Sequence, residues 1–129
     1  MSFVINPYRF GGGGGGFTDP TDIAGCQLWL DAEQGVYSDA GTTLATNNDT
    51  VQQWNDQSGN GNHVSQATGG SRPTFKTAGI NSKDSVEFAD PSFMDSATPV
   101  VAAPNTVFAV HVMTLSDASG GVIGTQRQT

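Results

Sequence analysis

The chain is predicted to be an all-β protein, an antiparallel β-sandwich, and its residue pattern supports this in two ways. Short segments in which apolar and polar residues alternate recur from residue 27 to residue 124, and turn-forming residues separate them. Helical periodicity does not persist over ten residues anywhere in this stretch. A length of 129 residues corresponds to about one domain, so we expect one β body.

Three strand candidates lie before residue 90. The first is residues 27–31, the second is residues 50–54, and the third, residues 85–88, alternates cleanly. The second candidate runs into residues 55–63, where two glycines and three asparagines favour tight turns. Prolines that can end strands lie in the connections, at Pro73, Pro91, Pro99 and Pro104. We therefore expect antiparallel strands joined by compact turns.

The strongest strand pattern covers residues 105–114. Phe108, Val110 and Val112 would form one face of this strand, and the opposite face is also largely apolar. A strand with two apolar faces is expected inside a sheet that is covered on both sides. Loss of the Phe108 side chain should then unfold or disassemble the body. A further strand is expected to begin at residues 121–124.

The N-terminal residues 1–10 are interpreted as a docking peptide, because five of the ten side chains are large and apolar. A peptide this short buries little by itself, but it can bind an open sheet edge of a partner. The residues expected to make the contact are Phe3, Ile5, Tyr8, Arg9 and Phe10. The alternative is a tail without a binding role.

Six consecutive glycines follow the docking peptide and are interpreted as a flexible tether. Fully extended, the run spans at most about 20 Å. The tether residues are Gly11, Gly12, Gly13, Gly14, Gly15 and Gly16. The organisation expected is thus a docking peptide at 1–10, a tether at 11–16 and a β body at 17–129.

The charge balance limits the partners of this chain. The formal net charge is −7 and the pI is near 4.3, so neither nucleic acid nor an anionic membrane is expected as a partner. No apolar run is long enough for a membrane helix, and the first residues lack the basic start of a signal peptide. The lone Cys26 excludes a disulfide within the chain.

Five motifs occur in a suggestive order along the body. They are LWLDA (28–32), VQQWNDQSGNGNH (51–63), RPTF (72–75), SVEF (85–88) and TVFAV (106–110). Together they resemble the first half of a laminin-G-like, concanavalin-A-like lectin/glucanase domain, over residues 23 to about 124. The most specific element is Trp-x-Asp-x-Ser-Gly-x-Gly-Asn, and the opening NPYRF is similar to the start of phage structural proteins.

The resemblance implies a jelly roll of two curved antiparallel sheets. Domains of this family are usually longer than this chain, so we expect the β-sandwich to be incomplete within residues 17–129. Either further residues or a neighbouring subunit would then complete it, because uncovered strand edges and faces are unfavourable. Members of the family occur in bacterial surface proteins, in sugar-binding modules, and in bacteriophage tail, fibre and capsid-associated proteins.

The chain is not expected to be an enzyme. Laminarinase-type members of the resembled family carry Glu-x-Asp-x-x-Glu on one strand, which supplies paired carboxylates for glycoside cleavage. This sequence has two glutamates, Glu33 and Glu87, too far apart to reproduce that motif. A nucleophile elbow, a phosphate loop and a Cys-His arrangement are also missing from the sequence.

No cofactor is required by the sequence, and calcium is the one metal worth testing. Asp56, Asp90 and Asp95 are weak candidate ligands, because carboxylates in loops are the hard oxygen donors that calcium takes. The favoured interpretation of Asp56 is instead a turn cap that binds its own backbone. Asp90 and Asp95 are also read as turn residues.

Other residues with chemical potential have structural interpretations that we favour. Trp29 and Trp54 could stack on sugars but are expected in the core. His63 is expected to be a polar loop residue, and His111 a buried or interfacial residue of the strongest strand. Cys26 is expected to be a small core residue.

These observations and the resemblance predict a structural protein of a bacteriophage virion, located in an appendage, a fibre or a capsid- or tail-associated position. Its partners would be other virion proteins and copies of itself, with a host-surface glycan as a further candidate. The alternative is a free carbohydrate-binding, lectin-like module of a bacterial surface protein. The virion interpretation requires the N-terminal docking peptide, and the lectin interpretation does not.

Overall fold

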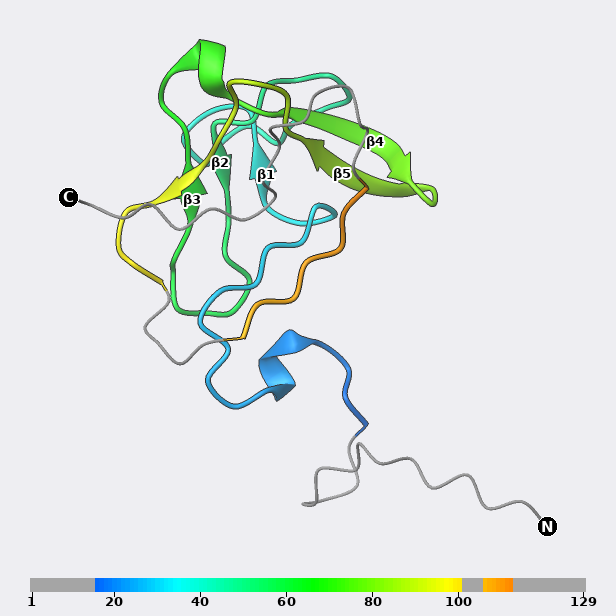
Figure 1. The fold of residues 1–129 in the computed structure, drawn as a ribbon, viewed down its shortest axis with the longest axis vertical. Coiled ribbons are helices and arrows are strands. Elements are labelled where there is room, and N and C mark those ends of the chain that lie inside the picture. The colour runs from blue at the N-terminus through cyan, green and yellow to red at the C-terminus, as the bar shows by residue number, and fades with distance from the viewer. Residues whose placement is uncertain (1–15, 101–105, 113–129) are drawn as a thin grey trace.

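Two small antiparallel sheets organise the chain in a computed structural model, which describes residues 16–100 and 106–112 (Figure 1). One sheet has the order β1-β2-β3-β6, and its four strands have two residues each: β1 (Val36–Tyr37), β2 (Gln53–Trp54), β3 (Val64–Ser65) and β6 (Asp95–Ser96). The other is a hairpin of β4 (Thr74–Ile80) and β5 (Lys83–Glu87). The described residues thus confirm the all-β class, with antiparallel pairing throughout.

The helical content of the described residues is limited to two turns of 3-10 helix, η1 (Pro20–Asp22) and η2 (Gly69–Ser71). Asp19 caps η1, because its carboxylate accepts a hydrogen bond from the Thr21 N–H while Asp22 reaches back to the Asp19 N–H. This local chemistry holds a single turn close to the predicted start of the body.

A compact core joins the hairpin to the four-stranded sheet. Val36, Val51 and Phe75 are buried together, and Val51 is completely excluded from solvent. Backbone hydrogen bonds hold the segment before β2 to the start of β4: the Val51 N–H donates to Pro73 O, and the Phe75 N–H donates to Asp49 O. Ala45, Trp54, Val86 and Met94 pack against this cluster from the periphery.

The predicted strands before residue 90 were confirmed in part. Residues 27–31 form a single bridge, Leu30 with Asp56, in place of a strand. Of residues 50–54, β2 covers the last two, and Thr50 makes a bridge to Thr74. The prediction at 85–88 was closest, because β5 includes all but Phe88, which is half exposed.

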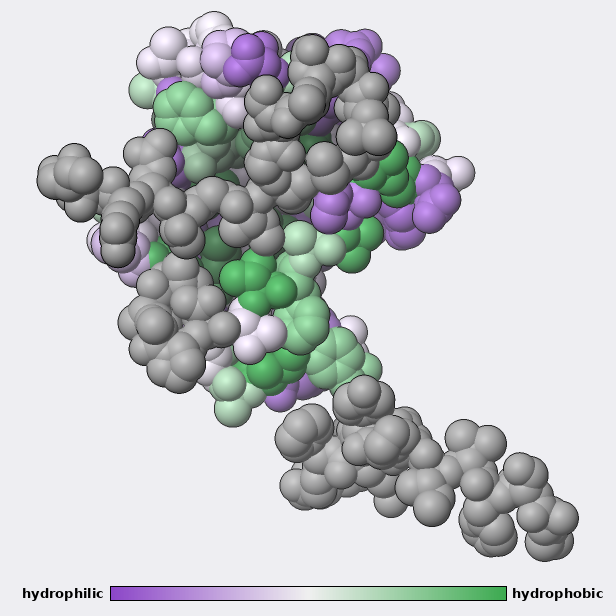
Figure 2. All heavy atoms as spheres, viewed as in Figure 1, coloured by the Kyte–Doolittle hydropathy of each residue, from purple (hydrophilic) through white to green (hydrophobic). Residues whose placement is uncertain are grey.

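The prediction of a buried strand at 105–114 was wrong for the residues described, 106–112. This segment has no strand pairing, Phe108 is 85% exposed and Val110 is 96% exposed. Alternating apolar side chains suit a strand, but a strand needs a neighbouring backbone, and the described residues supply none. Figure 2 shows hydrophobic residues at the surface over this segment and over the η1 end of the molecule. The further strand predicted at 121–124 lies outside the described residues.

Candidate functional site

Asp56, the centre of the most specific sequence motif, is a buried structural carboxylate that is 7% exposed. One of its oxygens, Oδ1, accepts the Trp29 N–H at 2.9 Å and the Ser58 N–H at 2.8 Å. The other, Oδ2, accepts the Ser58 hydroxyl at 2.7 Å and the Asn62 N–H at 3.0 Å. Asp56 therefore caps its own turn, as the favoured interpretation predicted, and also binds the segment that contains Trp29.

These hydrogen bonds determine the direction in which the pKa of Asp56 shifts. Burial of the carboxylate raises its pKa, because the charged form loses hydration. The hydrogen bonds from Trp29, Ser58 and Asn62 stabilise the charged form more strongly and leave the pKa of Asp56 below its ordinary value. The carboxylate is therefore charged at neutral pH and accepts hydrogen bonds through both oxygens.

Polar side chains of residues 55–63 attach this loop to residues 26–29; we call the combined region the polar clamp. The Asn60 amide donates to Cys26 O and the Asn62 amide donates to Gln27 O, both at 2.8 Å. The Ser58 hydroxyl oxygen also lies 3.2 Å from Gln27 O, while its single proton is donated over the shorter distance to Asp56. The most specific motif of the sequence thus uses much of its hydrogen-bonding capacity on groups of the same molecule.

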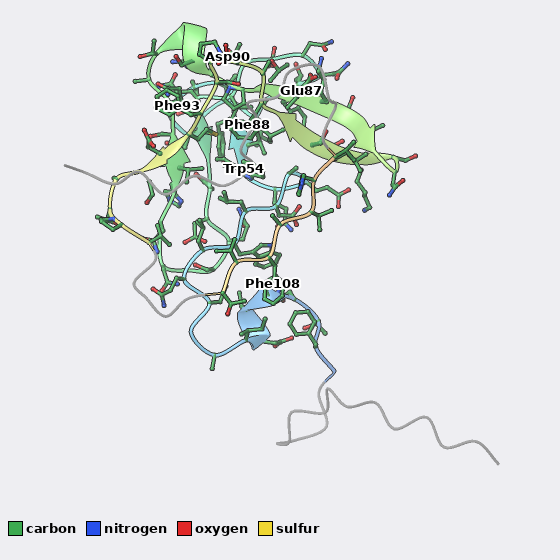
Figure 3. All side chains as sticks on the ribbon, viewed as in Figure 1. Trp54, Glu87, Phe88, Asp90, Phe93 and Phe108 are labelled. Atoms are coloured by element: carbon green, nitrogen blue, oxygen red, sulfur yellow. The ribbon has the colours of Figure 1, made fainter. Side chains whose placement is uncertain are left out.

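The remaining calcium candidates do not join Asp56 in a common site. Asp90 is exposed in the turn before Pro91, and Asp95 is exposed in β6, where it pairs with Ser65. Within residues 16–100 and 106–112, no three His, Cys, Asp or Glu side chains come together in a group that could hold a metal ion. In Figure 3, Asp90 lies toward the η2 end of the molecule, and Phe108 lies toward the η1 end.

The two tryptophans are partly buried. Trp54 packs against the core and its indole N–H donates to Asp31 O at 2.9 Å, which agrees with the predicted core role. His63 is exposed, and its Nδ1 accepts the Asp56 N–H at 3.1 Å. His111 is exposed, so the expectation of burial within this chain was wrong. Cys26 is half-buried.

The predicted docking residues lie outside the described part of the chain, as do the tether residues 11–15. Gly16 is described and exposed, and a Cβ added there would meet nothing within 4 Å. The three-part organisation therefore stays a prediction.

A pocket that the sequence did not reveal lies between the approach to β1, the segment 44–47 and the β4–β5 hairpin. Its volume is about 340 Å³, near the lower end of the range for small-molecule sites. Buried Phe75 and Val36 and half-buried Ala45 contribute apolar surface, and Leu44, which is exposed, contributes an apolar wall. The polar lining residues are Glu33, Gln34, Thr46, Asn47, Thr77 and Asp84.

Hydrogen bonds hold several polar groups of the pocket in place. Asn47 Oδ1 accepts the Thr77 N–H at 3.1 Å, which leaves the two N–H donors of the amide available for other partners. Asp84 Oδ1 accepts the Ala78 N–H at 3.2 Å. The pocket therefore offers both donors and acceptors beside an apolar surface.

Carboxylates outnumber cations at this pocket. Lys83 Nζ lies 2.9 Å from both carboxylate oxygens of Glu33, and this contact is the main cause of the raised pKa of Lys83. Asp31 and Asp84 are close enough to raise the Lys83 pKa further. The described lining residues include two carboxylates, Glu33 and Asp84, and no cation, and Lys83 is already paired with Glu33. The pocket therefore favours a neutral or cationic ligand over an anionic one.

Sequence reasoning missed this pocket because its members are separated by up to 52 positions and belong to no motif. Glu33 was considered only as one half of a catalytic pair, and Asp84 was not singled out. The useful signal was Glu33, two residues after the strand candidate 27–31, but it did not indicate which distant residues would face it.

Comparison of the chain with protein-family models, with curated proteins and with solved structures found no match. In the residues that the structure describes, none of the helices has the length and apolar character required to cross a membrane.

Proposed function

We propose that this chain is a structural protein of a bacteriophage virion, part of an appendage, a fibre or a capsid- or tail-associated layer. In this proposal residues 1–10 attach it to the particle, and the β body is a laminin-G-like jelly roll that the particle displays. The order of the five sequence motifs and the antiparallel pairing of both sheets support the jelly-roll assignment.

The observation that carries the proposal is the apolar surface of the described residues. Large side chains that a free monomer would be expected to bury are instead at least half exposed at four positions of one short segment, Val107, Phe108, Val110 and Val112. Contiguous exposed apolar surface marks sites of contact with other proteins. A virion component would cover such a surface with neighbouring subunits, whereas a module that acts alone would leave it in water.

The proposal is tested by removing residues 1–10 and measuring incorporation of the protein into purified particles by quantitative immunoblot. The truncated chain should keep the circular dichroism spectrum of the β body but be lost from particles. A matched variant with Ser2→Ala and Asn6→Ala keeps all the predicted anchors and should incorporate normally. Normal copy number of the truncated chain in particles would show that attachment does not run through the docking peptide.

A carbohydrate-binding module is the second candidate, and the pocket is the observation that favours it. The Asn47 amide, the Thr77 hydroxyl and the Asp84 carboxylate could bind sugar hydroxyls, which both donate and accept hydrogen bonds. Titration of the full chain with neutral oligosaccharides, monitored by NMR shifts of Asn47 and Thr77, tests this function. Asn47→Ala should abolish the oligosaccharide-induced shift of Thr77, and the exposed Thr68→Ala, outside the pocket, serves as the control.

A further inference from the structure

We propose that the acidic pocket receives the Tyr8-Arg9-Phe10 segment of a neighbouring copy of this chain, with the Arg9 guanidinium beside Asp84. This inference rests on the proposed docking role of residues 1–10. It adds the site to which that peptide binds and identifies the partner as a second copy.

The charge of the pocket selects a cationic occupant. Glu33 and Asp84 line the pocket, and no cation is among the described residues that line it. Lys83 is held by both oxygens of Glu33, whereas the described hydrogen bonds of Asp84 engage Oδ1. A guanidinium placed at Asp84 would reduce the excess of negative charge, and it matches the planar geometry of a carboxylate.

Two of the five basic residues of the chain, both arginines, remain as candidates to occupy the pocket. The five basic residues are Arg9, Arg72, Lys76, Lys83 and Arg127. Each of the three in the described residues already has partners: Arg72 donates to Gln66 O and Ala67 O, Lys76 contacts Asn48 and Glu87, and Lys83 contacts Glu33. Arg9 and Arg127 are therefore the candidates that the chain itself can supply.

The apolar part of the pocket favours Arg9 over Arg127. Tyr8 and Phe10 flank Arg9, whereas glutamine lies on both sides of Arg127. The pocket combines an apolar surface at Phe75 and Leu44 with its acidic rim, and an arginine between two aromatic residues has the matching combination. A volume of about 340 Å³ suits a few side chains rather than a long peptide.

A neighbouring copy is the occupant because the body begins at one end of the molecule and the pocket lies elsewhere. In Figure 1, η1 lies at the opposite end from β1, β4 and β5, the elements around the pocket. A peptide that leaves one body and enters a different patch of the next forms a head-to-tail contact. Such contacts generate rings or filaments, which are the symmetries of particle layers and fibres.

A charge exchange tests the contact in the full chain by sedimentation velocity. Arg9→Glu and Asp84→Arg should each weaken self-association by about tenfold or more, because each places like charges together. The double variant, Arg9→Glu with Asp84→Arg, restores opposite charges and should recover most of the association. Arg127→Glu changes the net charge as Arg9→Glu does and should leave association unchanged.

A milder substitution at Asp84 separates loss of the contact from unfolding of the hairpin. Asp84→Asn keeps an oxygen for the Ala78 N–H but removes the charge, so it should weaken association while the circular dichroism spectrum stays the same. Unchanged association in Asp84→Asn, or failure of the double variant to recover it, would overturn the inference.

Mixing two defective chains identifies the copy that supplies the peptide. A chain without residues 1–10 keeps the pocket, and the Asp84→Arg chain keeps the peptide, so the mixture should form a one-to-one complex that neither chain forms alone.

A wild-type chain that stays monomeric would overturn the inference, whether its pocket holds its own peptide or a sugar. Loss of particle incorporation on removal of residues 1–10, with self-association unaffected by the charge variants, would refute the pocket contact and leave the proposed function standing.

Discussion

The polar clamp and the segment 106–112 differ in how their side chains are satisfied. The clamp consists mainly of small polar residues. Hydrogen bonds bind its two segments together, such as those from the Trp29 N–H to Asp56 Oδ1 and from the Asn62 amide to Gln27 O. The segment 106–112 is mainly apolar, and Phe108 and Val110 are 85% and 96% exposed. The more polar segment is thus held by hydrogen bonds to other parts of the same molecule, whereas the apolar segment lies on the surface without strand pairing in the described residues.

This contrast shows where each kind of side chain finds its partners. A carboxylate or amide in a turn can bind backbone groups two to six residues away, as Asp56 does with Ser58 and Asn62. An apolar strand residue gains free energy only when another layer removes it from water. The described residues supply that layer for Phe75 and Val51 but not for Phe108.

The largest effect is expected from a pair of substitutions that separates the core from the exposed segment. Phe75→Ala should lower the free energy of unfolding by about 3–5 kcal/mol, because Phe75 is buried beside Val36 and Val51. Phe108→Ala should change it by no more than about 0.5 kcal/mol, because the ring is exposed. Urea unfolding of the full chain at low protein concentration measures both values. Equal losses would mean that Phe108 is buried in solution.

The second-largest change in stability is expected from a substitution in the polar clamp. Asp56→Asn should cost about 1–3 kcal/mol of unfolding free energy, because an amide cannot accept at both positions and would face the Ser58 hydroxyl and the Asn62 N–H with a donor. Asp90→Asn is the matched control, because Asp90 is exposed, and it should be neutral. A neutral Asp56→Asn would show that the clamp contributes little to stability.

A smaller effect of the same carboxylate depends on pH. The folded state holds the pKa of Asp56 below the ordinary 3.8, so it stabilises the charged form relative to the unfolded chain. This contribution is fully present above pH 3.8 and is lost as the pH falls through the lower, folded-state pKa. The acid dependence of stability below pH 3.8 should therefore be shallower in Asp56→Asn than in the wild-type chain. Parallel acid curves for the two proteins would contradict this assignment.

The smallest effect is expected at the tip of the β4–β5 hairpin and has the opposite sign. Asn81 and Ser82 join Ile80 to Lys83 with φ values of 49° and 62°, a two-residue turn in which both residues are left-handed. Ser82→Gly should stabilise the chain by less than about 1 kcal/mol, since glycine adopts this conformation without strain. Ser82→Ala keeps the strain and should give no gain in the thermal midpoint. A loss of stability in Ser82→Gly would mean that the turn is not formed as described.

Three features could be predicted from the sequence because they depend on short-range chemistry. The all-β class follows from alternation over a few residues, β5 from the pattern at 85–88, and the turn at Asp56 from the Asx chemistry of residues 55–63. Each of these depends on residues within about ten positions of one another. Local conformational preference and nearby hydrogen bonds are therefore sufficient to account for them.

Tertiary structure decided which residues are buried and which distant residues meet. Nothing in the residue pattern distinguishes Phe75 from Phe108, yet the backbone of residues 48–51 lies against Phe75, and the described residues supply no strand partner for Phe108. The acidic pocket likewise joins Glu33, Asn47 and Asp84, which come from three separate segments. Burial and long-range pairing depend on where distant backbone lies, and alternation along one segment carries no information about that position.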